Sequence, residues 1–278
     1  MSLRKMEQKH MPELLFLGSS GAIQVPSFHC SCETCREARS NSKRRRTRAS
    51  IALIGKEVVL VDASPDLESQ LERESIRRIN RVFITHWHFD HVWGLAALGE
   101  PSSLSKWPTI DVYLPKQVAY HFDQELSFMK NRVNVHGSHV GDKFELPDAT
   151  WTVVKTTHTA ESVGFIVEFS KKLAYLVDSV VPPPETVNLL EDLDYLILEA
   201  TVDELAPHKG ERWMNFSLPQ AVEFWRQVGA DKCILTHLSC HSWKNRKLVA
   251  GLSYEERLEY EKKNPGLKFA YDGMRIEL

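Results

Sequence analysis

Short apolar runs, separated by polar turns and by longer amphipathic segments, alternate along most of the chain. Such runs have the length of buried strands, whereas the spacing of Leu218, Val222 and Trp225 is typical of one face of a helix. The predicted strands are Leu14–Leu17, Ile51–Ile54, Val58–Val61, Val82–Thr85, Ile110–Leu114, Trp151–Thr157, Val163–Phe169, Leu173–Val177, Tyr195–Leu198, Cys233–Thr236, Leu267–Tyr271 and Met274–Glu277. The predicted helices are His91–Leu98, a segment from Pro115 to about Met129, and Leu218–Val228. This alternation indicates an α/β fold.

Two pairs of the predicted strands are joined by short turns. Gly55-Lys56-Glu57 joins Ile51–Ile54 to Val58–Val61, and Asp272-Gly273 joins the last two strands of the chain. Asp-Gly is a strong signal for a tight reversal between strands. We therefore expect two β-hairpins.

The composition predicts a folded core and gives no general affinity for polyanions. Of the 278 residues, 42% are hydrophobic and 26% are charged, and the formal net charge is −2. No apolar run approaches the ~20 residues that span a bilayer, and the first ten residues lack the apolar region of a secretory signal. We therefore expect a cytoplasmic protein without a membrane partner, and the charge argues against nucleic acid.

The densest cluster of metal-binding side chains directly follows the predicted strand Val82–Thr85. It is the segment His86-Trp87-His88-Phe89-Asp90-His91, which combines three imidazoles and one carboxylate. These are ligands suited to Zn²⁺, Mn²⁺ or Fe. Three more residues of the same kinds, His158, Asp178 and His237, each follow a predicted strand. The sequence thus predicts a metal site.

The pattern H-x-H-x-D-H resembles that of the metallo-β-lactamase superfamily without a departure. The resemblance implies a four-layer αββα sandwich and a binuclear metal site. It assigns the first metal to His86, His88 and His158, the second metal to Asp90, His91 and His237, and the bridging position to Asp178. Asp62 ends the strand Val58–Val61 and either orients a metal-binding histidine or is a simple turn residue. Two such metals acidify a water and stabilise developing charge, so no serine or cysteine nucleophile is required.

The cysteines predict a second metal site. Cys30, Cys32 and Cys35 form a C-x-C-x-x-C motif, whereas Cys233 lies within an apolar strand and is interpreted as a small buried hydrophobe. Three thiols in six residues in a reducing compartment favour zinc over disulfides. The fourth ligand must come from another part of the chain.

The cysteine motif narrows the resemblance to one family. Together with Leu17-Gly18-Ser19-Ser20-Gly21, Val25-Pro26, Ile234–Ser239 and Tyr271-Asp272-Gly273-Met274, it resembles the PhnP family of phosphodiesterases. The resemblance implies one domain over 1–278 with a zinc loop near residues 29–36, and hydrolysis of 5-phosphoribosyl 1,2-cyclic phosphate to the 1,5-bisphosphate. It also implies two active-site ions, with Mn²⁺ favoured and Zn²⁺ or Fe as alternatives, a structural Zn²⁺, and a homodimer.

The chain departs from the family at two positions. Cys240 occupies the place of the family's fourth zinc ligand, a histidine, and His241 follows it. Thiolate at Cys240 would complete a four-cysteine site, with His241 as the alternative ligand. Asn215 occupies the place of a histidine proposed to protonate the leaving group or bind phosphate. Asparagine can hydrogen-bond an oxyanion but cannot deliver a proton at pH 7, so His208 is a substitute candidate, although an ordinary surface histidine is the simpler interpretation.

The leading hypothesis is a binuclear phosphodiesterase that hydrolyses a small cyclic or diester phosphate by attack of a metal-bound hydroxide. Its catalytic candidates are Asp90, Asp178, His208 and Asn215. The alternatives are an RNA 3′-end nuclease, a thioester or lactone hydrolase, and a non-catalytic metal-binding protein. The basic run from Lys43 to Arg48 is interpreted as a solvated loop, a contact for an anionic substrate, or an RNA contact.

Overall fold

The computed structural model describes residues 12–99, 108–201, 215–244 and 247–278. The first group of strands is β1 (Glu13–Gly18), β2 (Ser50–Ile54), β3 (Val58–Val61), β4 (Arg81–Phe83), β5 (Ile110–Pro115), β6 (Val133–Ser138) and β16 (Arg275–Glu277). The second group is β7 (Lys143–Glu145), β8 (Thr150–Lys155), β9 (Val163–Glu168), β10 (Lys172–Leu176), β11 (Tyr195–Glu199), β12 (Lys232–Thr236) and β15 (Leu267–Phe269). They form two sheets, in the orders β16-β1-β2-β3-β4-β5-β6 and β15-β12-β11-β10-β9-β8-β7. A separate hairpin pairs β13 (His241–Lys244) with β14 (Lys247–Ala250).

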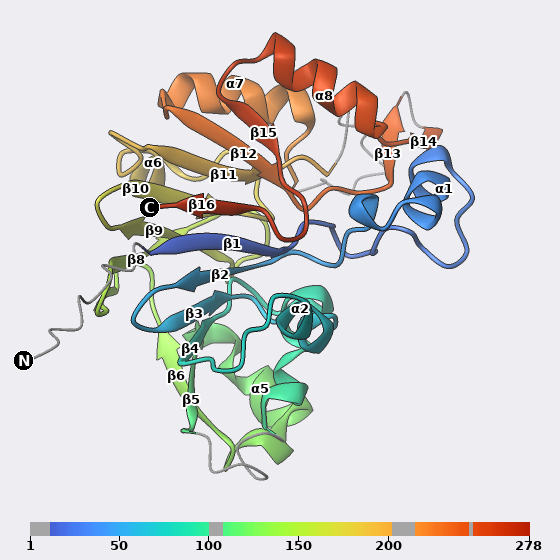
Figure 1. The fold of residues 1–278 in the computed structure, drawn as a ribbon. Coiled ribbons are helices and arrows are strands. Elements are labelled where there is room, and N and C mark those ends of the chain that lie inside the picture. The colour runs from blue at the N-terminus through green and yellow to red at the C-terminus, as the bar shows by residue number, and fades with distance from the viewer. Residues whose placement is uncertain (1–11, 100–107, 202–214, 245–246) are drawn as a thin grey trace, which may run out of the picture.

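Helices cover the outer faces of both sheets. The α-helices are α1 (Glu33–Ser40), α2 (Leu67–Arg73), α3 (Phe89–Val92), α5 (Ala119–Glu125), α6 (Pro184–Val187), α7 (Leu218–Val228) and α8 (Tyr254–Lys263). The 3₁₀ turns are η1 (Ser42–Arg44), η2 (Lys116–Val118) and η3 (Ser127–Met129). Figure 1 shows α2 and α5 beside the first sheet and α7 and α8 beside the second. Within the described residues, no helix is both long and apolar enough to cross a membrane.

Apolar side chains fill three layers between and around the sheets. Between the sheets, Phe83 of the first stacks on Trp151 of the second with ring centroids 4.9 Å apart. Alternation along β3 sends Val61 into this inner layer and its neighbour Leu60 into the layer under α2. Phe224 of α7 packs in the third layer, against the other face of the second sheet. The arrangement is the four-layer αββα sandwich that the sequence resemblance implies.

The hairpin predicted around Asp272-Gly273 is wrong, although the strands that flank it exist. β15 pairs in parallel with β12 of the second sheet, whereas β16 pairs with β1 of the first. Gly273 adopts φ 89° within the turn that carries the chain from one sheet to the other. A turn signal predicts a reversal but not the partner of each strand. The other predicted hairpin, between β2 and β3, is confirmed.

Two predicted helices are interrupted in the structure. The segment predicted as His91–Leu98 begins earlier, as α3, and breaks at Gly94, whose N–H donates to the Ala63 carbonyl at 2.8 Å. A Cβ at Gly94 would lie 2.1 Å from the Ser64 carbonyl oxygen, so only glycine fits there. Pro115 ends β5, and the segment that follows it is divided into η2, α5 and η3.

Candidate metal centre

The predicted metal ligands lie on loops that follow β4, β8, β10 and β12. Two of them, Asp178 and His237, have left-handed backbone conformations with φ 53° and 54°, as does Asp62 beyond β3 with φ 64°. Non-glycine residues rarely adopt this conformation, and it is concentrated at functional sites. These sharp bends directly after a strand turn the side chains of three separate loops toward one point.

The structure brings all seven predicted ligands together in two adjoining groups. The first group is His86, His88, His158 and Asp178, and the second is Asp90, His91, Asp178 and His237. Within each group the ligand atoms lie within 4.8 Å of one another. Asp178 belongs to both groups, which is the position that a bridging ligand requires.

The contacts between these side chains fit a bound cation. His88 Nδ1 lies 2.8 Å from His86 Nε2 and 3.2 Å from His158 Nε2, so three ring nitrogens converge. His91 Nε2 is 2.9 Å from Asp178 Oδ2, yet this buried nitrogen makes no well-aligned hydrogen bond within the described residues. Converging nitrogens and carboxylates suit a borderline divalent ion such as Zn²⁺, Mn²⁺ or Fe.

Asp62 holds one of the histidines from behind. Its Oδ2 lies 2.7 Å from His91 Nδ1, and its carboxylate also accepts bonds from the Thr85 N–H at 2.8 Å and from the Thr85 hydroxyl. Asp62 is fully buried. A carboxylate on Nδ1 fixes the ring and leaves Nε2 facing the cluster. The geometry therefore favours the orienting interpretation of Asp62 over a simple turn.

Burial and neighbouring charge set the protonation of the cluster. Burial holds the pKa of His86 well below its usual value, which favours the neutral imidazole that a metal requires. Burial opposes charge on Asp178, but His237 and His91 outweigh it and hold the Asp178 pKa below its usual range. Burial also opposes charge on His237, yet Asp178 raises its pKa to about 10. The pocket therefore strongly stabilises positive charge between its carboxylates.

Glu199 and Thr201 belong to the site but were not found from the sequence. Glu199 ends β11, is fully buried, and accepts bonds from the Ser179 N–H at 2.6 Å and from the Thr201 hydroxyl. Thr201 Oγ1 also lies 3.0 Å from His237 Nδ1. Burial, and then the charge of Asp178, raise the Glu199 pKa. The sequence signal that could have identified Glu199 is its position as an acidic residue at the end of an apolar strand, at the same sheet edge as the metal ligands.

The side-chain amide of Asn215 is already engaged. Its Nδ2 donates to Asp178 Oδ1 at 3.1 Å and to Glu199 Oε2 at 2.7 Å. Asn215 thus links the shared carboxylate to the buried glutamate. His208, the other candidate for a proton donor, lies outside the described residues.

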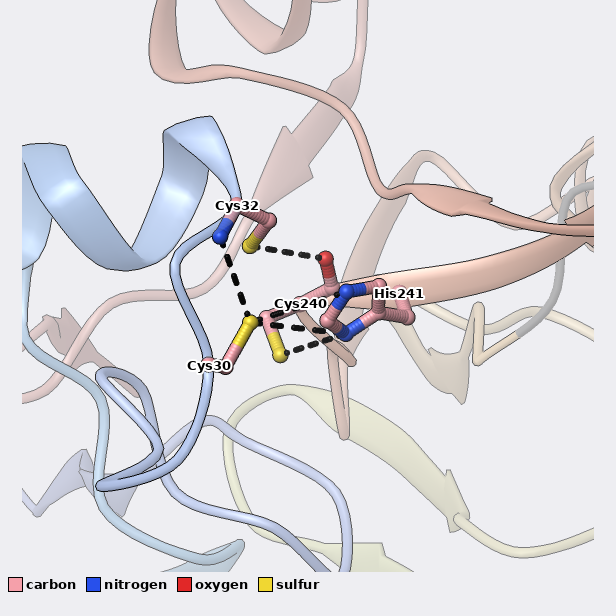
Figure 2. Close-up of side chains that lie close together, drawn as sticks. All are labelled: Cys30, Cys32, Cys240 and His241. Carbon is pink, nitrogen blue, oxygen red and sulfur yellow. Dashed lines mark hydrogen bonds between the residues drawn. The ribbon is translucent and has the colours of Figure 1, made fainter.

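The cysteine cluster joins the loop before α1 to the segment after β12 (Figure 2). Cys30, Cys32, Cys240 and His241 form a third group of potential ligands within 4.8 Å of one another. The closest contacts of the ring are His241 Nδ1 to Cys240 Sγ at 3.1 Å and Nε2 to Cys30 Sγ at 3.6 Å. Burial, and then the neighbouring thiols, raise the pKa of Cys240. Such crowding of thiols fits a thiophilic cation such as Zn²⁺.

Cys35 is outside that group of four but interacts with all three of its thiols. It is fully buried and its sulfur accepts the Ser27 N–H at 3.4 Å. Proximity alone therefore favours His241 over Cys35 as the fourth ligand, whereas Cys35 remains linked to the cluster through its interactions with the three thiols. Cys233 is fully buried within β12, away from the cluster, as the sequence predicts.

The histidine and cysteine clusters line one cavity of about 670 Å³. Its lining includes His88, Asp90, His158, Asp178, Asn215 and His237, together with Cys30, Cys32, Cys240 and His241. A cavity of this size suits a small-molecule substrate.

Comparisons with known proteins agree with this geometry. Residues 57–238 match the model of the beta-lactamase superfamily domain. The chain is 26% identical over 257 residues to ribonuclease Z of Bacillus subtilis (strain 168), covering 85% of this chain and 78% of that protein. It is 24% identical over 237 residues to an octanoyltransferase of Porphyromonas gingivalis, covering 82% of this chain, and it spans only 46% of that relative's length. The crystal structure of a diphosphatase from the PhnP family superposes with a TM-score of 0.78 at 26% identity, covering 96% of this chain and 98% of that one.

Proposed function

The chain belongs to the metallo-β-lactamase superfamily and is a metal-dependent hydrolase, and from this premise we propose that it is a phosphodiesterase acting on a small cyclic or diester phosphate. The observation that carries the proposal is the pair of ligand groups that share Asp178 inside a cavity of small-molecule size. The likeness to a PhnP-family diphosphatase supports a phosphorylated substrate. The leading candidate is 5-phosphoribosyl 1,2-cyclic phosphate.

Two divalent ions, when bound, supply an acidified water and a positive field for the phosphoryl oxygens. His86, His88 and His158 would hold one ion, Asp90, His91 and His237 the other, and Asp178 both. Zn²⁺, Mn²⁺ and Fe all suit these nitrogen and oxygen donors, and we favour Mn²⁺.

The other residues position this machinery. Asp62 holds His91 through Nδ1, and Thr201 holds His237 through Nδ1. Asn215 donates to both the shared Asp178 and Glu199, so the main role of its amide is to position Asp178. Bonds of this kind keep ligand nitrogens and oxygens aimed at the same point. A proton for the leaving alkoxide then comes from water or from His208.

An RNA nuclease is the second candidate, because a ribonuclease Z covers most of this chain. The net charge of −2 argues against it, since RNA binding relies on an excess of positive charge. The preferred function remains hydrolysis of a small phosphate ester.

The test is turnover of 5-phosphoribosyl 1,2-cyclic phosphate by the Mn²⁺-loaded protein, with products identified by phosphorus NMR. A generic aryl phosphodiester, a dinucleoside diphosphate and a short structured RNA are assayed in parallel. We expect selective formation of the 1,5-bisphosphate. Shortening of the RNA without cleavage of any small ester would overturn the proposal in favour of the nuclease.

A further inference from the structure

A second cavity, of about 580 Å³, lies between α1, η1, α8 and the end of β15, and it shares no lining residue with the first. Arg44 of η1 contacts Glu255 of α8 at 2.9 Å, which joins two of its walls. Figure 1 shows α1 and α8 on the same side of the molecule. The proposed phosphodiesterase activity does not use this cavity.

The second cavity carries an excess of positive charge. Five basic side chains and two acidic ones line it: Lys43, Arg44, Arg46, Arg257 and Lys268, with Glu37 and Glu261. Both acidic groups already have basic partners, Glu37 with Arg44 at 3.3 Å and Glu261 with Lys268 at 2.8 Å. The remaining charge favours an anion, and more than one positive group favours a dianion such as phosphate.

Arg46 is the buried basic residue that is best suited to hold an anion in this cavity. Its side chain is only 6% exposed, and its Nε and Nη2 have no hydrogen-bond partner within the described residues. Burial lowers the Arg46 pKa to about 10, so the guanidinium is still charged at pH 7. Buried donors are almost always paired in folded proteins, so an acceptor is expected here.

The carboxylate of Asp272, whose charge acts on Arg46, does not supply that acceptor. Asp272 adds to the field around Arg46, but its oxygens accept the Ser19 hydroxyl at 2.8 Å, the Thr47 N–H at 2.7 Å and the Thr47 hydroxyl at 2.6 Å. Arg73 donates to the same carboxylate at 3.4 Å. Asp272, which lies in the turn between the two sheets, is therefore already occupied by Ser19, Thr47 and Arg73.

The rim of the cavity is apolar and partly aromatic. Tyr254 is 45% exposed, Leu258 is 38% exposed and Tyr271 is 57% exposed. The Arg44 guanidinium lies over the Tyr254 ring, 4.7 Å from its centroid. Exposed rings beside cations suit a flat ligand with an anionic group.

We propose that this cavity binds a small phosphorylated compound that carries an aromatic ring, with the phosphate at Arg46 and Lys43 and the ring against Tyr254 and Tyr271. A pocket of this volume accommodates a molecule the size of a nucleoside monophosphate. Arg46 supplies a buried fork of donors, and Lys43 supplies an exposed cation at the entrance. The site is separate from the catalytic cavity.

The experiment is calorimetric titration of the metal-loaded protein with adenosine 5′-monophosphate, adenosine and inorganic phosphate. We expect the monophosphate to bind at least tenfold more tightly than either fragment. Arg46→Gln should weaken it at least tenfold and leave phosphodiester turnover unchanged. Arg77→Gln is the matched control, because Arg77 is a surface arginine paired with Glu72 outside the cavity. Equal affinity of wild type and a folded, zinc-containing Arg46→Gln would overturn the proposal.

Two further variants keep the test decisive. Arg46 also lies in the field of Cys240, Cys35 and Cys32, so its replacement could disturb the cysteine cluster. If it does, the double variant Lys43→Ala/Tyr254→Ala, which changes only exposed side chains of the rim, should still weaken binding at least tenfold, and wild-type affinity in it would contradict the site. Loss of binding in Asp178→Ala but not in Arg46→Gln would assign the ligand to the catalytic cavity instead.

Discussion

The histidine cluster and the cysteine cluster line the same cavity but are assembled in different ways. The ligands of the first come from four loops between His86 and His237, so they meet only when both sheets are stacked. Those of the second come from the loop before α1 with the first turn of that helix, Cys30 to Cys35, and from the segment after β12. The first depends on the whole fold, whereas the second ties an N-terminal loop to that fold.

The two clusters also differ in their ligand atoms. The histidine cluster combines nitrogen and oxygen donors around a shared carboxylate, which is the donor set of a two-metal hydrolytic site. The cysteine cluster is rich in sulfur, which is typical of structural zinc sites. We therefore expect loss of a ligand to remove turnover in the first cluster and to remove stability in the second.

The largest effect on turnover is expected from Asp178→Ala. This carboxylate belongs to both ligand groups, so its removal should lower the affinity for both ions and abolish measurable phosphodiester hydrolysis. The protein should still fold, because the apolar layers are untouched, although the melting temperature should fall as the buried histidines lose their carboxylate and the bound ions are lost. The measurement is turnover beside metal content by mass spectrometry. Retained turnover with both ions bound would rule out the bridging role.

A smaller effect on turnover is expected from Asp62→Asn. This variant tests whether the contact between Asp62 and His91 contributes to metal affinity. The amide keeps the volume of the buried side chain but removes its charge beside His91 Nδ1, 2.7 Å away. Loss of such a carboxylate typically costs about 10–100-fold in metal affinity or activity. Metal titration of the apoprotein measures it. Asp142→Asn, at an exposed carboxylate, is the control, and an identical affinity in both variants would make Asp62 a turn residue only.

The sequence predicts the histidine cluster well because its evidence is local and ordered. Four of its seven ligands lie in one segment, His86 to His91, and the other three follow strands whose positions the apolar runs predict. Glu199 has no such signal, because one acidic residue at a strand end is usually a cap or turn. Its partners, Ser179, Thr201 and Asn215, are known only once the loops are placed in space.

The same limit explains the error in the fold. The turn at Asp272-Gly273 was correctly predicted, but β15 and β16 are edge strands of different sheets. Their residues alternate in the same way whichever sheet they join. Local patterns therefore predicted most strands, whereas the sheet that each strand joins depended on contacts between distant segments.

For the cysteine cluster, Cys240→Ser should lower stability more than turnover. We expect loss of the proposed structural zinc and a fall in melting temperature of about 5–10 °C, which corresponds to a few kcal/mol in a chain of this size. Turnover per folded, metal-loaded molecule should fall less than tenfold, because the histidine ligands are unchanged. Calorimetry and zinc content measure both quantities. Cys233→Ala is the matched control, since this buried thiol lies in β12 outside the cluster, and it should keep its zinc.

The smallest effect is expected from His241→Ala, and it decides which residue completes the zinc site. His241 lies closer to the other ligand atoms as a set, but Cys35 is fully buried, interacts with all three thiols and accepts the Ser27 N–H. A thiolate also binds Zn²⁺ strongly and is further stabilised by such an N–H donor. We therefore expect His241→Ala to keep one zinc and Cys35→Ala to lose it. The visible spectrum of the cobalt-substituted protein distinguishes four sulfur ligands from three, and a spectrum altered by His241→Ala but not by Cys35→Ala would assign the fourth position to the imidazole.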